Sequence, residues 1–189
     1  MPKSILRACL FALAFLMAPA WADSADDPIK VKVQKNGDTV IIDLTTVVAA
    51  TPQEVWDVLT DFDHMTQFLP NLEMSKVLEK NGDVWSVEQK GRTSHAGFTF
   101  SFQTTKQITL KAFDSIQSHL TGGTLKKHES LTTLAPEGNG TRITYHAESI
   151  SGVWVPPLLG SSVVEGEVRK QYQDMTGEML KRKAAHAAN

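Results

Sequence analysis

The pattern of apolar and polar residues predicts a pair of strands near the beginning of the chain. In residues 29–35, isoleucine and valines alternate with lysines, as in a half-exposed strand. Asn36-Gly37 predicts a hairpin turn after it. Residues 39–49 are so rich in β-branched and other apolar side chains that we expect a second strand buried on both faces.

A capped helix is predicted directly after the second strand. Thr51 can cap it, Pro52 suits the first helical position, and Glu54 stands where the partner of a capping box belongs. The next apolar residues recur at helical spacing and form one face: Val55, Trp56, Val58, Leu59 and Phe62. A second short helix should follow and end at the apolar turn Phe68-Leu69-Pro70.

The middle of the chain has a period of two, which predicts an antiparallel meander. The expected strands cover residues 75–79, 84–92, 98–110, 115–121, 125–134 and 142–150. The expected turns between them include Asn81-Gly82, Gly122-Gly123 and Asn139-Gly140.

A long amphipathic helix is predicted to close the chain. Its apolar stripe repeats at spacings of three or four residues and comprises Val164, Val168, Tyr172, Met175 and Met179. The cations Lys181-Arg182-Lys183 stand near its carboxyl end, where positive charge is favourable.

The order of these elements resembles the START-like (SRPBCC) superfamily, in its polyketide cyclase/dehydrase-like and coenzyme Q-binding branch. The resemblance rests on the start Thr51-Pro52-x-Glu54, on Phe68-Leu69-Pro70, and on the succession of elements from about residue 40 to 183. It implies an α+β helix-grip fold, in which a curved antiparallel sheet wraps a long C-terminal helix and two short helices follow the first long strand. It also implies a ligand cavity between the sheet and the last helix.

The first residues are predicted to be a cleaved secretory signal peptide. Lys3 and Arg7 precede an apolar run, and Ala20-Trp21-Ala22 supplies the small residues of a cleavage site before Asp23. The apolar run is shorter than the ~20 residues that a membrane span needs. We therefore expect residues 1–22 to be the signal, 23–28 a short mobile leader and 29–189 one helix-grip domain, in a periplasmic or secreted protein.

Cleavage changes the charge and the redox chemistry of the chain. It removes two of the 19 basic residues and none of the 21 acidic ones, so 17 against 21 leaves a formal charge of −4. The only cysteine, Cys9, leaves with the signal peptide, which excludes disulfides, cysteine nucleophiles and thiolate metal sites. A mildly acidic chain without a run of lysine and arginine gives no support for nucleic-acid binding.

The residues expected to line a cavity lie on the inner face of the sheet and on the apolar stripe of the last helix. Phe98, Phe100 and Phe102 share one strand face, and three phenyl groups facing water would be costly. Alternation leaves open whether they form a filled core or a cavity wall. Gln89 is expected to orient a ligand carbonyl. The predicted set is Phe68, Trp85, Val87, Gln89, Phe98, Phe100, Phe102, Tyr145, Leu158, Val164, Val168 and Tyr172.

An apolar loop is expected beside the cavity mouth, between the last strand and the last helix. Its residues Trp154 to Leu159 include two prolines that stiffen it. The loop is either a gate, with transient membrane or partner contact, or a cover folded over the open end of the core.

No catalytic set, metal site or cofactor is predicted. The six histidines include no pair at the helical spacing of a metal motif. His128 and Glu129 point to opposite strand faces, and pairs such as His146 and Glu148 are expected on solvated faces. The chain has no Gly-x-Ser-x-Gly elbow and no glycine-rich phosphate loop.

These features predict an exported carrier that holds a lipid-like or aromatic molecule, since apolar molecules need shielding from water. By resemblance, a quinone or an isoprenoid lipid is the candidate ligand. The alternative is a cyclase, dehydratase or hydrolase on a polyketide-like substrate, which would need a titratable group of perturbed pKa in the cavity. A third hypothesis is an interaction module with a filled core and a functional loop around Trp154. The pattern specifies no oligomeric state.

Overall fold

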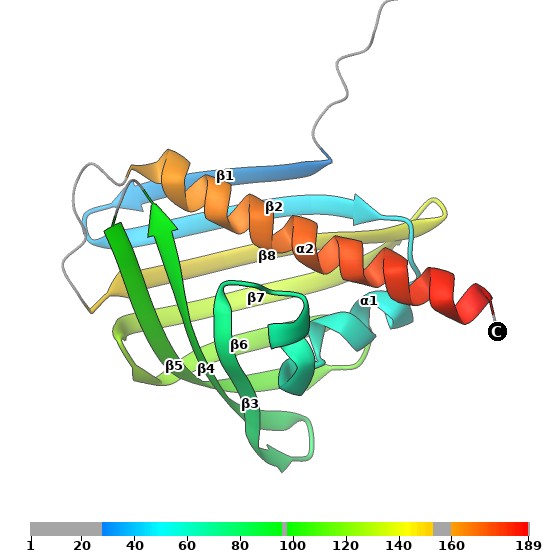
Figure 1. The fold of residues 1–189 in the computed structure, drawn as a ribbon, viewed down its shortest axis with the longest axis horizontal. Coiled ribbons are helices and arrows are strands. Elements are labelled where there is room, and N and C mark those ends of the chain that lie inside the picture. The colour runs from blue at the N-terminus through cyan, green and yellow to red at the C-terminus, as the bar shows by residue number, and fades with distance from the viewer. Residues whose placement is uncertain (1–27, 96–97, 153–159, 189) are drawn as a thin grey trace, which may run out of the picture.

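The computed structural model describes residues 28–95, 98–152 and 160–188. Within these ranges the strands form one antiparallel sheet in the order β1-β2-β8-β7-β6-β5-β4-β3 (Figure 1). The strands are β1 (Ile29–Asn36), β2 (Thr39–Val48), β3 (Leu72–Asn81), β4 (Val84–His95), β5 (Phe98–Lys111), β6 (Ser115–Gly123), β7 (Leu125–Glu137) and β8 (Gly140–Ser151). Strands β1 and β3 are therefore the two edges.

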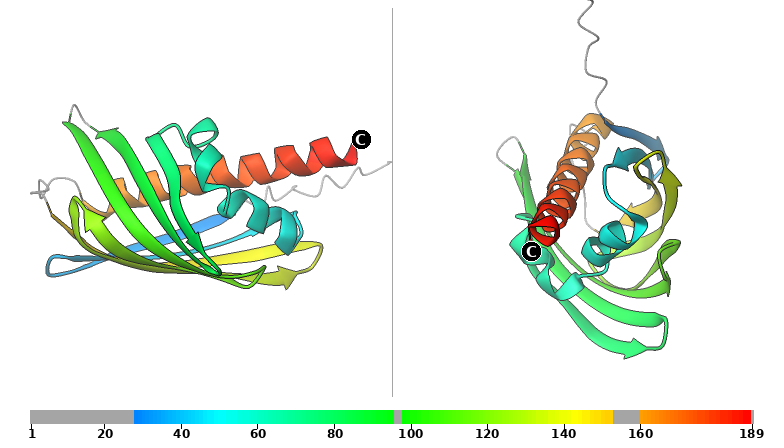
Figure 2. Two further views of the ribbon diagram at one scale, coloured as in Figure 1. Left: turned by 90° about the horizontal axis from the view of Figure 1, so that it is seen from below. Right: turned by 90° about the vertical axis from the view of Figure 1, so that its right-hand side faces the viewer.

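The sheet curves around the long helix α2 (Ser161–Ala187), which lies across its concave face (Figure 2). The helix α1 (Pro52–Leu59) and the 3₁₀ helix η1 (Phe62–Gln67) connect β2 to β3, and α1 packs against α2. This arrangement confirms the predicted α+β helix-grip fold. No helix in the described ranges has the length and apolar character to span a membrane.

The start of α1 forms the predicted capping box. The Thr51 hydroxyl accepts a hydrogen bond from the Glu54 amide at 3.3 Å, and the Glu54 carboxylate accepts one from the Thr51 amide at 2.7 Å. Pro52 occupies the first turn, where its missing amide costs nothing. In contrast, the N-cap of α2 is Gly160, and no side chain caps that helix.

The hairpin turns lie one residue away from their predicted places. The two turn residues are Gly37-Asp38, Gly82-Asp83 and Gly138-Asn139, and the preceding residue of each still belongs to its strand. Each leading glycine has a positive φ, between 55° and 58°, whereas the second turn residue does not. Glycine at the first central position is the pattern of type II′ turns, and not of the Asn-Gly type I′ turn.

Strand β2 is buried on one face only, which corrects the prediction that both faces are covered. Leu44, Thr46 and Val48 are buried against the interior, whereas Val47 is 45% exposed. The sheet is a single layer with a helix on one side, so the outer face of β2 remains in contact with solvent.

The edge strand β3 is irregular. Its pairing with β4 shifts between Leu72 and Met74 and again between Val77 and Glu79. The Asp63 carboxylate of η1 accepts a hydrogen bond from the Val77 amide at 2.8 Å. The carboxylate therefore takes up one of the backbone N–H groups of this edge strand, which is no longer free to pair with another strand.

The filled core lies where α1 and η1 meet the C-terminal half of α2. Val55 and Val58 of α1 and Met179 of α2 are fully buried there. Arg182 closes this end with an ion pair to Asp61 at 2.8 Å. The N-terminal half of α2 covers the rest of the concave face, and the cavity lies under that half.

Candidate functional site

A cavity runs between the concave face of the sheet and the N-terminal half of α2. It consists of three adjoining chambers of about 300, 190 and 160 Å³. The chambers share wall residues, and Gln171 of α2 lines all three. We call the 300 Å³ chamber the mouth and the other two the inner chambers.

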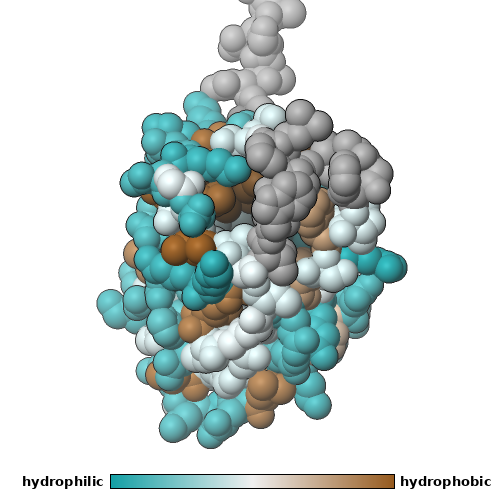
Figure 3. Space-filling model, turned by 90° about the vertical axis from the view of Figure 1, so that its left-hand side faces the viewer, coloured by the Kyte–Doolittle hydropathy of each residue, from teal (hydrophilic) through white to brown (hydrophobic). Residues whose placement is uncertain are grey.

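The mouth has mainly apolar walls. Its apolar lining includes Phe100 and Phe102 of β5, Leu125 of β7, and Val164 and Val168 of α2. Figure 3 views the molecule from this end and shows apolar side chains gathered among polar ones. Such walls suit the apolar body of a ligand.

The inner chambers combine an apolar end with a polar wall. The apolar end is formed by Leu59, Phe62, Met65, Leu69, Ile108, Ile116 and Met175. The polar wall is formed by Gln89, Thr104, Lys106, Ser118, His128, Ser130, Thr132, Tyr145, Gln171 and Tyr172. No aspartate or glutamate of the described part of the chain lines these two chambers.

Lys106 is the cationic group of the polar wall. It lies on the same face of β5 as Phe100, Phe102 and Ile108, and burial lowers its pKa to about 8. Within the described ranges its ammonium group forms no hydrogen bond or ion pair. At neutral pH it is therefore mostly a charged group without a protein counter-ion.

His128 lies near Lys106 on β7. Its Nδ1 is 2.8 Å from the Ser149 hydroxyl of β8. Burial, together with the positive charge of Lys106, lowers the pKa of His128 to about 4. The imidazole is therefore neutral at pH 7 and can donate from one ring nitrogen and accept at the other.

Two tyrosines meet where the sheet faces α2. The ring centroids of Tyr145 and Tyr172 are 5.7 Å apart. Burial raises the pKa of Tyr145 to about 12, and burial together with Tyr145 raises the pKa of Tyr172 well above its ordinary value. Both hydroxyls stay protonated at neutral pH and can act as hydrogen-bond donors.

The remaining polar groups of the wall differ in whether they have hydrogen-bond partners. The Gln89 amide donates to the Ser75 hydroxyl at 3.2 Å and approaches the Met65 sulfur at 3.4 Å. The Ser118 hydroxyl is buried without a hydrogen-bond partner in the described part of the chain. An unsatisfied buried hydroxyl costs free energy that a ligand atom could recover.

Seven of the predicted cavity residues line the chambers: Gln89, Phe100, Phe102, Tyr145, Val164, Val168 and Tyr172. Val87 is fully buried in the core, and Trp85 packs edge-on against Phe62 at 6.1 Å. Phe68 lies at the core end, with the Arg182 guanidinium 5.5 Å from its ring centroid. These three do not line the chambers. The side chain of Phe98, Leu158 and the Trp154–Leu159 loop lie outside the described residues.

The prediction missed Lys106, His128, Ser118 and Gln171. Alternation from Phe100 would have placed Lys106 on the inner face, but a lysine is ordinarily assigned to solvent. His128, to which the sequence assigned no role in the site, faces the cavity. By contrast, His146 does lie on the outer face, where its Nδ1 is 2.7 Å from Asp43.

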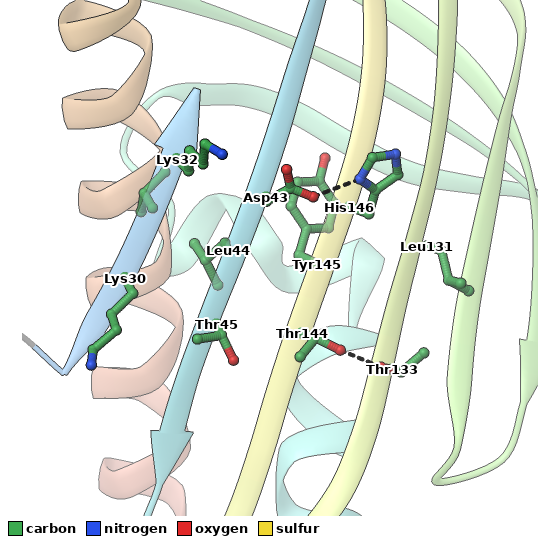
Figure 4. Close-up of a pocket in the computed structure, with 11 residues that line it drawn as sticks. Lys30, Lys32, Asp43, Leu44, Thr45, Leu131, Thr133, Thr144, Tyr145 and His146 are labelled. Atoms are coloured by element: carbon green, nitrogen blue, oxygen red, sulfur yellow. Dashed lines mark hydrogen bonds and ion pairs between the residues drawn. The ribbon is translucent and has the colours of Figure 1, made fainter. Parts of the chain in front are cut away.

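A second depression of about 450 Å³ lies on the outer face of the sheet, over β1, β2, β7 and β8 (Figure 4). Asp43 and His146 form its polar centre, and each side chain is about half exposed. Thr133 and Thr144 hydrogen-bond across the strands beside them. Exposed cross-strand pairs of this kind are usual on a solvated sheet face, so we assign the candidate site to the inner cavity. In the described part of the chain, no cluster of metal-ligating side chains occurs.

Comparison with known proteins finds the same architecture. Residues 48–176 match the sequence profile of the family described as polyketide cyclase/dehydrase and lipid transport. No curated protein matches the chain.

Solved structures share the fold at low identity. A STAR-related lipid transfer protein from Xanthomonas axonopodis has a TM-score of 0.68 at 16% identity, covering 80% of this chain and 93% of its own. The Zhui aromatase/cyclase from Streptomyces sp. R1128 has a TM-score of 0.60 at 16% identity, covering 76% and 95%. A START superfamily protein from Mycobacterium smegmatis has a TM-score of 0.56 at 16% identity, covering 78% and 98%.

Proposed function

The chain belongs to the polyketide cyclase/dehydrase and lipid transport family, and from this premise we propose that it is an exported carrier for a lipid-like or aromatic small molecule. The ligand occupies the cavity between the sheet and α2. A quinone or an isoprenoid lipid is one candidate of this class.

The cavity itself is the observation that carries the proposal. Its mouth is walled by Phe100, Phe102, Val164 and Val168, and it continues inward past Gln171. The alternative hypothesis of an interaction module requires a filled core, and a filled core would leave no such space. Burial of an apolar ligand here removes its surface from water and supplies the binding free energy.

Export is supported by the sequence alone. Residues 1–22 have the charged start, apolar run and small-residue cleavage site of a signal peptide. In an aqueous compartment outside the cytoplasm, an apolar molecule needs a carrier to cross from one membrane to another. We therefore propose that the mature protein acts in the periplasm or outside the cell.

Native mass spectrometry of the protein purified from its host tests the carrier function. The wild type should carry a bound small molecule, seen as a mass added to the folded protein and lost on denaturation. Val168→Trp should reduce the bound fraction at least about tenfold, because the indole fills space shared by the mouth and the inner chambers.

The matched control is Gln173→Trp, which adds the same indole to the exposed side of α2. It should retain the ligand like the wild type. A wild-type protein that is always empty, and that takes up no lipid from vesicles, would contradict the carrier function.

An enzyme remains the second candidate, because His128 and Lys106 give the cavity wall two groups with lowered pKa values. Neutral His128 could accept a proton from a bound substrate, and Lys106 could donate one. Incubation of the protein with its co-purified molecule distinguishes the two functions. A carrier returns the molecule with unchanged mass and structure, whereas a cyclase or dehydratase converts it.

A further inference from the structure

The inner chambers contain a cation without an anion. Lys106 forms no ion pair within the described ranges, and the walls of both inner chambers lack carboxylates. Among the described residues, the only acidic one that lines the cavity is Glu167, which borders the mouth. Lys106 is half-buried, and an ammonium group withdrawn from water is costly unless an opposite charge accompanies it.

A neutral imidazole shares the walls of the inner chambers with this cation. Lys106 of β5 lies opposite Val87 of β4 and Leu120 of β6. His128 of β7 lies opposite Ser149 of β8 and lines the same two inner chambers as Lys106. The positive charge of Lys106 lowers the pKa of His128, as expected for two side chains that line the same chambers.

Two further groups near this level have unused hydrogen-bonding capacity. The Ser118 hydroxyl is buried and unpartnered in the described part of the chain. Gln171 faces the chambers from α2, and no hydrogen bond of its amide occurs within the described ranges. A ligand oxygen in the inner chambers would find an ammonium, an amide and a hydroxyl around it.

We propose that the ligand is an acid with an apolar body, whose ionised carboxylate pairs with Lys106 while its body extends toward Phe100 and Phe102 at the mouth. This inference rests on the proposed carrier function and specifies the class of its ligand. An ionised head group supplies the missing counter-charge, and charge-assisted hydrogen bonds are about twice as strong as neutral ones. A neutral head group would leave the ammonium unpaired.

The proposal makes binding depend on pH in one direction. The titratable groups that face Lys106 are His128 from β7, Tyr145 from β8 and Tyr172 from α2, and none of them changes charge between about pH 7 and about pH 9.5. A bound carboxylate would favour the protonated form of Lys106. Affinity should therefore be highest below a pH of about 8 and fall above it.

Isothermal titration calorimetry with dodecanoate and 1-dodecanol tests the proposal on the mature protein. The two probes share their chain and differ in the ionised head group. The wild type should bind dodecanoate at least about tenfold more tightly than dodecanol at neutral pH. Lys106→Met should remove this preference, and Lys106→Arg should keep most of it.

Lys111→Met is the matched control, because Lys111 lies on the same strand with its side chain 77% exposed. It should behave as the wild type. Raising the pH to about 9.5 should weaken dodecanoate binding about tenfold in the wild type and leave Lys106→Met unchanged.

The possible outcomes separate the two proposals. If both probes bind the wild type equally and Lys106→Met has no effect, the carrier function stands and the acid ligand is wrong. If a neutral short-chain ubiquinone binds more tightly than dodecanoate and depends on Lys106, the acid ligand is again wrong. If no amphiphile binds the wild type, the carrier function itself fails.

Discussion

Individual side chains on the concave face decide what the cavity can bind. Phe100, Phe102 and Lys106 occupy alternate positions of one strand, so the same alternation that builds an apolar mouth also places a cation further in. Burial lowers the pKa values of Lys106 and His128, since both lose hydration when charged. The cavity therefore has an apolar entrance and an electropositive interior.

Replacing Lys106 with methionine should stabilise the protein at neutral pH, by about 1–3 kcal/mol in the free energy of unfolding. The folded protein releases the Lys106 proton near pH 8, whereas the unfolded chain holds it up to the ordinary lysine pKa of 10.5. Between these two pH values the unfolded state binds more protons than the folded state. The free energy of unfolding of the wild type therefore rises with pH over this range. The advantage of the variant should shrink as the pH rises above about 8.

Urea unfolding of the wild type and Lys106→Met between about pH 7 and about pH 10 measures this difference. Lys111→Met, at an exposed position of the same strand, should show almost none. An advantage that stays constant across the range would show that Lys106 is not a desolvated cation.

At this scale the sequence predicted the apolar part of the site better than the polar part. The positions of Phe100, Phe102, Val164 and Val168 follow from period and hydrophobicity. Lys106 departs from the rule that lysines face water, because the curved sheet under α2 places it in the wall of the inner chambers. A pattern read one strand at a time contains no information on that curvature.

At the scale of elements, a close backbone approach joins the segment after η1 to strand β4. The Asn71 carbonyl, just before β3, accepts a hydrogen bond from the Arg92 amide at 3.0 Å. A side chain at Gly91 would collide with this carbonyl and would lie 2.7 Å from the Phe102 ring. Gly91 is therefore required by a close approach of two backbone segments.

Gly91→Ala should destabilise the protein by about 2–4 kcal/mol, since a methyl group here meets backbone that has no room to move. It should also displace Phe102 and so weaken ligand binding. Gly166→Ala is the control, because a methyl group there meets nothing within 4 Å on an exposed part of α2. That change should stabilise by up to about 1 kcal/mol through helix propensity.

Thermal unfolding followed by circular dichroism compares the two glycine variants. Equal melting temperatures for Gly91→Ala and Gly166→Ala would show that the close backbone approach at residue 91 does not require a glycine.

Thr51→Ala should cost about 1 kcal/mol of stability, because it removes the side-chain half of the capping box. Thr66→Ala, at an exposed position of η1, provides the control and should change stability by less than about 0.5 kcal/mol. Denaturant unfolding of both variants gives the comparison, and a Thr51 variant as stable as the wild type would show that the cap is unimportant.

The helical elements were more predictable than the turns because their signals are local. Thr51, Pro52 and Glu54 specify the start of α1 within one turn of chain. The Asn-Gly and Gly-Asn pairs at the hairpins, by contrast, allow two registers that differ by one residue. Cross-strand partners such as Glu137 and Gly140 decide between them, and those contacts are set by the whole sheet.

At the scale of the whole molecule, α2 has a filled half and a hollow half. Its C-terminal half packs on α1 with Met179 fully buried, and its N-terminal half roofs the cavity. The filled half provides stability from a compact core. The hollow half leaves apolar surface of Phe100, Phe102 and Val164 available to a ligand.

The mature protein should lack the first 22 residues. Intact-mass measurement on protein from the host should give the chain beginning at Asp23, because Ala20 and Ala22 provide the small residues of the cleavage site. Ala22→Leu should block processing and leave the full mass, whereas the same change at Ala25, three residues past the cut, should not. Full-length wild-type protein in the cytoplasm would contradict export.

The irregular edge at β3 has a consequence for how the protein behaves at high concentration. A regular edge strand offers a row of free amides and carbonyls that can template a strand of another molecule. Here two register shifts break the row, and the Asp63 carboxylate already holds the Val77 amide. An incoming strand would meet an interrupted ladder with a negative charge at its centre, so the sheet resists growth into fibrils from this side.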